Sequence, residues 1–184
     1  TGINNTAIGR SAMYSNLDGA NNVAVGYNAL DANTSADYNV AVGNNALTSN
    51  TTGGNNAAFG HQALNSNTTA SENTAVGYQA MYSNTTGVRN TASSMYSLYG
   101  NTTGNDNTAY GYAALRYNNG SNNTAMGVDA LDANTSASNN TAVGYKALTA
   151  NTTGDTNVAI GKDSMKTNTT GTNNTALGPR SLQS

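Results

Sequence analysis

The sequence predicts an all-β fold, a parallel β-solenoid of eleven coils with about 17 residues and two short strands in each coil. A five-residue motif recurs at a fixed spacing, and a column of apolar residues keeps step with it along the whole chain. The spacing is too short for a pair of helices, because helical repeats are about 33 residues or longer. We therefore expect residues 1–184 to form a single repeat domain.

The motif has the consensus Asn-(Thr/Val)-Ala-aliphatic-Gly and occurs eleven times. Nine of the ten steps between copies are 17 residues long, and the step from Asn107 to Asn123 is 16. Asn and Thr make up about a third of the chain, which alone would also suit disorder, but a disordered chain has no reason to keep such a phase. The first residues of the copies form the first asparagine column: Asn5, Asn22, Asn39, Asn56, Asn73, Asn90, Asn107, Asn123, Asn140, Asn157 and Asn174.

An apolar column lies eight positions after each of these asparagines and contains only Leu and Met. This Leu/Met column consists of Met13, Leu30, Leu47, Leu64, Met81, Leu98, Leu115, Leu131, Leu148, Met165 and Leu182. Each repeat is too small to bury an apolar face alone, and stacked repeats bury a continuous one. We therefore expect the Leu/Met column to be the core of the solenoid.

The first copy illustrates the expected order of elements within a coil. Residues 5–8 predict the first strand, 9–11 a bend, 12–15 the second strand, and 16–19 a turn in which Gly supplies a positive φ. In the one short step, the missing residue falls in such a turn. A deletion there leaves the strand register intact, whereas a slip inside a strand would reverse the side chains.

The alternation of side chains along residues 5–8 sorts them onto two faces. We expect the aliphatic residues, such as Ile8 and Val25, to face the interior together with the Leu/Met column. Small residues such as Ala7 and Gly9 would then form a smooth outer surface. A thin coil buries little apolar area by itself, so we expect three chains to associate through this surface.

Asparagine also recurs in the turns, as a second asparagine column. Its members are Asn16, Asn33, Asn50, Asn67, Asn84, Asn101, Asn118, Asn134, Asn151 and Asn168. We expect the first column to form a ladder of amides along the axis, since a primary amide both donates and accepts. For the second column, a ladder and a simple preference of Asn for turns remain equal alternatives.

One coil departs from the consensus, because Ser93 and Ser94 replace the aliphatic residue and the Gly of the motif. Nearby Met95, Tyr96 and Tyr99 are candidates to fill the gap. We expect this coil to be the weak point of the rod or a place where another molecule packs. As for the ends of the sequence, Thr1 looks like the tail of a turn and Ser184 falls in mid-repeat, so we expect a segment of a longer fibre or an end-to-end polymer.

The charge content is low, with 9% charged residues and a net charge of −2. The basic residues are scattered, so nothing favours a nucleic acid or an anionic membrane as a partner. No apolar run approaches the roughly 20 residues that span a bilayer, so we expect no membrane insertion in this segment.

The sequence offers little for catalysis or metal binding. His61 is the single His and there is no Cys, which disfavours a zinc site or a nucleophilic triad. Asp129 and Asp132 are close enough in sequence to hold a cation weakly, but solvated loop acids are the better interpretation. We expect no enzyme activity and no cofactor.

Tyrosine is the one candidate binding feature. Tyr27, Tyr78, Tyr112 and Tyr145 share the position after the motif Gly. Outward aromatic columns stack on sugars or contact protein partners, and the alternative is that they shield the sheet edge or a subunit seam.

The motif resembles a known repeat. Asn157-Val158-Ala159-Ile160-Gly161 is similar to the S-V-A-I-G repeat of YadA-like trimeric autotransporter adhesin heads, and residues 73–81 also resemble repeats of phage tail fibres. This resemblance implies a left-handed parallel β-roll in a homotrimer, displayed for attachment, and no catalytic residues. The 17-residue repeat is longer than the usual adhesin repeat of about 14 residues. The handedness of the coil and the geometry of the trimer can therefore differ from those of the adhesin heads.

These observations predict a structural component of an extracellular fibre, an adhesin head or stalk, or a viral tail fibre. The location would be extracellular, on a cell surface or a virion. The alternatives are a self-assembling extracellular filament and a face that binds a host receptor or glycan through the tyrosines. Ice binding through Thr arrays is less favoured, because it needs outward Thr ladders on strands and the Thr-Thr pairs lie in turns.

Overall fold

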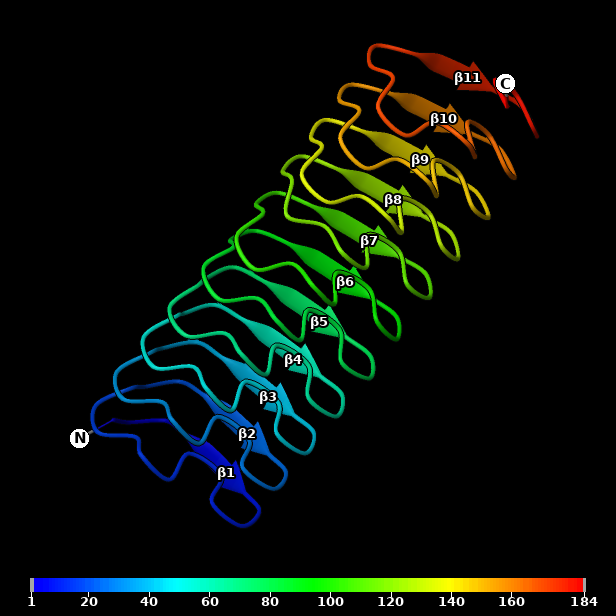
Figure 1. Ribbon diagram of the computed structural model, residues 1–184. Coiled ribbons are helices and arrows are strands. Elements are labelled where there is room, and N and C mark those ends of the chain that lie inside the picture. Colours follow the sequence, from blue (N-terminus) through cyan, green and yellow to red (C-terminus); the bar gives the residue numbers. More distant parts are fainter. Residues whose placement is uncertain (1, 184) are drawn as a thin grey trace.

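The computed structural model describes residues 2–183, which form a parallel β-solenoid with one strand in each coil (Figure 1). Thr1 and Ser184, on which the expectation about the ends of the chain was based, lie outside the described residues. At about 4.8 Å per coil, the rod is about 50 Å long. The strands are β1 (Thr6–Ile8), β2 (Val23–Val25), β3 (Val40–Val42), β4 (Ala57–Phe59), β5 (Thr74–Val76), β6 (Thr91–Ser93), β7 (Thr108–Tyr110), β8 (Thr124–Met126), β9 (Thr141–Val143), β10 (Val158–Ile160) and β11 (Thr175–Leu177).

The strands pair in sequence order into one parallel sheet, and equivalent residues face each other in every pair. Ala24 of β2, for example, is opposite Ala41 of β3. The coil that is one residue shorter keeps this register, with Ala109 opposite Ala125 between β7 and β8. The deletion therefore falls where the sequence placed it, in the turn.

The second strand expected at residues 12–15 is wrong, since these residues form turns. The reason lies in the adjacent residues Ala29 and Leu30 of the next coil, which are both fully buried. An extended strand would send these neighbours to opposite faces. Instead, Asn28 and Leu30 have positive φ angles of 52° and 54°, so the backbone curls and both apolar side chains point inward.

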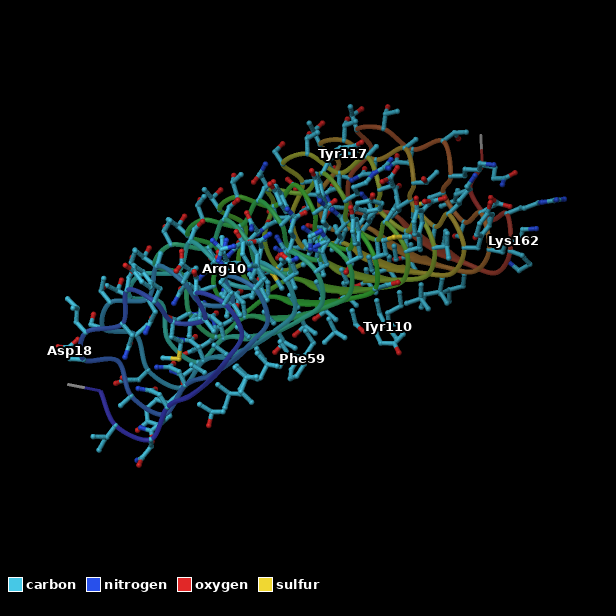
Figure 2. The ribbon with its side chains drawn as sticks, turned by 90° about the horizontal axis from the view of Figure 1, so that it is seen from below. Arg10, Asp18, Phe59, Tyr110, Tyr117 and Lys162 are labelled. Carbon is cyan, nitrogen blue, oxygen red and sulfur yellow. The ribbon has the colours of Figure 1, made fainter. Side chains whose placement is uncertain are left out.

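The expected assignment of the two strand faces is also wrong. Ala24 and its equivalents in the middle of the strands are buried, while large apolar residues at the ends of the strands, such as Ile8 and Phe59, are exposed. Figure 2 shows Phe59 and Tyr110 projecting from one side of the rod. The space behind the sheet is narrow because the Leu/Met column fills it, so only a methyl group fits on the inner side of the strand.

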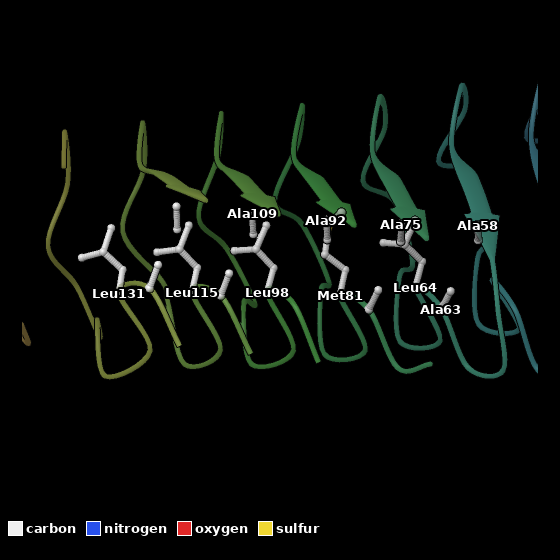
Figure 3. Close-up of a cluster of buried hydrophobic side chains, with 14 of the residues drawn as sticks. Ala58, Ala63, Leu64, Ala75, Met81, Ala92, Leu98, Ala109, Leu115 and Leu131 are labelled. Atoms are coloured by element: carbon white, nitrogen blue, oxygen red, sulfur yellow. The ribbon is translucent and has the colours of Figure 1, made fainter. Parts of the chain in front are cut away.

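The Leu/Met column lies inside the solenoid, where it packs against the alanines of the strands. Figure 3 shows Ala75 of β5 facing the row that includes Leu64 and Met81. Burial of each large apolar side chain stabilises the fold by about 1.5–3 kcal/mol. Leu182, in the last of the described coils, is the exception, with 53% of its surface exposed.

Both asparagine columns are hydrogen bonded, and all but the members nearest the ends of the rod are buried. In the first column, Asn5 Oδ1 accepts the backbone N–H of Asn22 at 2.9 Å, and Asn22 Nδ2 donates to the carbonyl of Ala36 at 2.8 Å. In the second column, the amides bond to each other along the axis, as when Asn84 Nδ2 donates to Asn67 Oδ1 at 3.0 Å. The two columns thus join neighbouring coils and tie the turn to the strand within each coil.

In most coils the Gly that follows the strand is required by space as well as by conformation. Gly26 has a φ of 139°, and a Cβ there would lie 2.5 Å from the carbonyl oxygen of Gly43 in the next coil. Ser94 occupies this position in the irregular coil with a φ of 146°. The Gly of the Asn-x-x-Gly turn, in contrast, does not have the positive φ that we expected, and Gly19 instead leaves room for the carbonyl of Ala36.

Candidate functional site

The four tyrosines singled out in the sequence lie on the bend after the strands. Tyr27, Tyr78, Tyr112 and Tyr145 are 45%, 41%, 39% and 44% exposed, so each ring has one part packed and one part open to solvent. They do not cover the ends of the sheet, which are formed by β1 and β11. Three of them fall at regular intervals, since Tyr78, Tyr112 and Tyr145 come from every second coil.

An aromatic cluster surrounds the irregular coil. Tyr96 makes edge-on contacts with Tyr78, Tyr99 and Tyr112, with centroid distances of 5.6, 5.6 and 6.0 Å. Tyr99 also stacks on Tyr82 at 5.4 Å. Edge-to-face pairs at such distances contribute about 0.5–1.5 kcal/mol each. Desolvation, together with the neighbouring tyrosines, raises the pKa of Tyr96.

This cluster partly answers the expectation for the irregular coil. Tyr96 and Tyr99 do pack around the place where Ser93 and Ser94 break the motif, whereas the side chain of Met95 is 41% exposed. The role of Tyr96 as the centre of the cluster was missed in the sequence. It occupies a position that holds Asn, Gln or a charged residue in most other coils, and this exception was the available signal.

His61 and Asp132 each have partners within the chain. His61 packs at 5.4 Å from Tyr78, and its Nδ1 lies 3.1 Å from the carbonyl oxygen of Asn44. Asp132 pairs with Arg116 at 2.9 Å. Burial raises the pKa of Asp132, although the Arg116 guanidinium opposes this. Within residues 2–183 no group of three or more His, Cys, Asp or Glu side chains is placed to hold a metal ion.

The outer face of the sheet runs along all eleven strands of the rod. Each strand contributes two outward side chains, on either side of its buried alanine, and none of these is charged in any of the eleven strands. The outward residue at the end of the strand is aliphatic or aromatic in ten strands and Ser93 in β6. We call this surface the sheet face, and it consists of the first and third residues of β1 to β11.

The first residues of the strands add a polar component to the sheet face. Thr74, Thr91, Thr108, Thr124 and Thr141 follow one another in β5 to β9. These threonines point outward from the strands, whereas the expected orientation of the strands would have placed them inside with the aliphatic residues. Each of these strands therefore presents one hydroxyl group, from its first residue, and one further outward side chain, from its third residue.

The described part of the rod, residues 2–183, has no pocket on its surface and no helix long and apolar enough to cross a membrane. Any ligand of these residues would therefore bind on an open surface. The chain matches no protein-family model, no curated protein and no solved structure.

Proposed function

We propose that the chain is a rigid structural segment of an extracellular fibre, an adhesin or a viral tail fibre, and that it assembles with copies of itself. The observation that carries this proposal is the sheet face, an uncharged and mostly apolar strip that runs the whole length of the rod. Soluble monomers rarely expose long contiguous apolar surfaces, and such surfaces mark interaction sites. The resemblance of the motif to YadA-like and tail-fibre repeats supports the same function.

The rod is built for stiffness along its axis. Backbone bonds connect each coil to the next at many positions, and the asparagine columns add side-chain bonds in the same direction. Because the coil is repeated with the same register throughout, no hinge interrupts the sheet between β1 and β11. These properties suit reach and display at a cell surface or a virion.

The sheet face replaces the surface that we first expected to associate. Association through the alanines is excluded, because those of β2 to β10 are fully buried within the chain. The sheet face is about 50 Å long and about 10 Å wide, so pairing of two copies would cover about 1,000 Å² in total. This is the lower limit for a specific interface, and in a homotrimer each chain would share the same strip between two neighbouring chains.

Sedimentation velocity and electron microscopy of the chain test the proposal. We expect straight rods that contain three chains. The double variant Val42→Glu/Phe59→Glu, which places two charges on the sheet face, should sediment as a monomer. The control Thr52→Glu/Thr69→Glu adds the same charges to exposed turns of the same coils and should remain assembled. Circular dichroism checks that both variants fold.

A wild-type chain that stays monomeric at high micromolar concentration would contradict the self-association. An assembly that survives the sheet-face charges would show that the chains meet through another surface. An open filament instead of a trimer would support the alternative of a self-assembling extracellular filament.

Ice binding is a second candidate, favoured by the outward Thr residues of β5 to β9. These form the kind of strand ladder that this function needs. It ranks lower because Phe59, Tyr110 and Met126 project from the same face and break its flatness. An ice-recrystallisation assay with the wild type and Thr91→Leu/Thr108→Leu tests it, and crystals that grow as fast as in buffer would exclude it.

A further inference from the structure

Five consecutive coils present an exposed apolar residue directly after the motif position held by Gly or Ser94. These residues are Tyr78, Met95, Tyr112, Val128 and Tyr145, and each is 39–44% exposed. Tyrosine and a smaller aliphatic side chain alternate along this line. We call the three aromatic residues the tyrosine row.

The spacing of the tyrosine row is set by the stacking of the coils. Successive members are two coils apart, which corresponds to about 9.6 Å at the strand spacing of a parallel sheet. Sheet pairing holds this distance along the axis, and the shorter coil before β8 does not change it because the register of β7 and β8 is kept.

We infer that the tyrosine row binds an extended, uncharged β-1,4-linked glycan that runs parallel to the rod. In such a glycan each sugar is turned by about half a turn relative to the one before it, so the chain presents the same ring face once per disaccharide. That repeat is close to the two-coil spacing of the row. An α-1,4-linked chain curls and cannot present its rings in a straight line at this interval.

The chemistry of the row suits such a ligand. Tyrosine offers a large apolar ring that packs on the C–H face of a sugar, together with a hydroxyl that can bond to a sugar hydroxyl. Tyr96 contacts Tyr78 and Tyr112 edge-on and thereby restrains both rings. Lys146 Nζ lies 5.2 Å from the centroid of Tyr145, where it can donate to sugar hydroxyls.

The open surface also favours a long ligand over a small one. No pocket encloses a single sugar within residues 2–183, so affinity would come from several stacking contacts along a straight chain. The three tyrosine side chains are themselves uncharged, which suits stacking on a neutral polysaccharide, and Lys146 and Lys162 beside Tyr145 can donate hydrogen bonds to its hydroxyl groups. The proposal goes beyond the structural role and does not rest on the sheet face, since the row lies on the bend after the strands.

Binding to insoluble polysaccharides tests the inference. We expect the wild-type chain to be retained by microcrystalline cellulose or by chitin, and not by amylose. Retention should persist in the Val42→Glu/Phe59→Glu variant if that variant is monomeric, which separates this test from that of self-association. Isothermal titration with the β-1,4-linked hexasaccharide of the retained polymer measures the affinity.

Single changes of Tyr78, Tyr112 or Tyr145 to Ala should each weaken binding by about five- to tenfold, the expected loss of one stacking contact. The triple variant should lose binding. Tyr38→Ala removes a more exposed tyrosine, at 60%, from another part of the coil and should bind as the wild type does.

The sharpest variant keeps the composition and changes only the spacing. The exchange Tyr112→Val/Val128→Tyr moves the middle ring by one coil, so that the intervals become three coils and one coil. We expect this variant to lose affinity as much as Tyr112→Ala does. Undiminished binding by the exchange variant, equal retention by amylose, or no retention of the wild type by either β-1,4-linked polymer would overturn the inference.

Discussion

Replacement of Asn84 tests the contribution of the asparagine columns to stability. Asn84 is fully buried, and its side chain takes part in three hydrogen bonds. Its Nδ2 donates to Asn67 Oδ1 at 3.0 Å and to the carbonyl of Gly87 at 2.9 Å, and its Oδ1 accepts from Asn101 Nδ2 at 2.9 Å. Asn84→Ala removes all three bonds at once.

The size of the effect follows from these bonds. A buried hydrogen bond contributes about 1 kcal/mol net, so the three together amount to about 3 kcal/mol. Asn67 Oδ1 also loses its partner inside the rod, which adds a desolvation cost. The carbonyl of Gly87 keeps a donor, since Asn73 Nδ2 bonds to it at 2.9 Å. We therefore expect a loss of about 3–4 kcal/mol in the free energy of unfolding.

Asn84→Asp should be at least as destabilising at neutral pH, because a carboxylate cannot donate to the two acceptors that surround it. Burial disfavours the charged form of a carboxyl group when few hydrogen-bond donors surround it, and this raises its pKa. A raised folded-state pKa means that the penalty is present at high pH and is relieved as the pH falls through that pKa. The stability gap between Asn84→Asp and the wild type should therefore narrow on acidification.

Urea unfolding followed by circular dichroism measures the global effect, and hydrogen exchange measures the local one. In a stacked repeat protein each coil contacts only its neighbours, so the loss of protection should centre on the coils that contain Asn67, Asn84 and Asn101. Thr86→Ala changes an exposed residue of the same turn and should be neutral within about 0.5 kcal/mol. An Asn84→Ala variant as stable as this control would refute the view that the columns hold the coils together.

Three further outcomes are expected. Ser94→Gly should stabilise the rod by about 1 kcal/mol in urea unfolding, because Ser94 has a φ of 146° that suits Gly, and a decrease would contradict this explanation. Leu98→Ala should lower the free energy of unfolding by about 2–5 kcal/mol and Leu182→Ala by less than about 1 kcal/mol, since only Leu98 is fully buried. Equal losses would be inconsistent with the packing. The hydrogen bond from Arg89 lowers the pKa of Asp106. The ion pair therefore contributes stability above the ordinary pKa of 3.8, and this contribution is lost as the pH falls through the lower folded-state pKa. If the free energies of unfolding of the wild type and Asp106→Asn do not converge on acidification, this explanation is contradicted.

The repeat made the solenoid predictable from the sequence, because a period of 17 with a constant register leaves few other folds. The short step was equally informative, since a deletion between Asn118 and Gly120 is tolerable only in a turn. The sequence did not reveal which face of the strand is inside. Ala24 and Val25 alternate with the same period in either case, and only the width of the interior decides between them.

The sequence itself contains an indication that residues 12–15 and their equivalents do not form a strand. Ala29 and Leu30 are adjacent and belong to columns that vary little from coil to coil, which is incompatible with a strand that has one inner face. The aromatic cluster had a weaker signal, since Tyr96 stands out only against the polar residues of neighbouring coils. The tyrosine row could be recognised only when the bend after the strands was placed on the surface.

The register of one coil upon the next has a consequence for how the chain folds. Contacts between coils join residues about 17 positions apart in a chain of 184, a relative contact order of about 0.1. Sheet proteins usually bring together distant segments and fold slowly, whereas this value is typical of fast-folding helical proteins. Once a few adjacent coils have formed, each new one needs to close only a short loop, so growth can proceed from any point along the chain toward both ends.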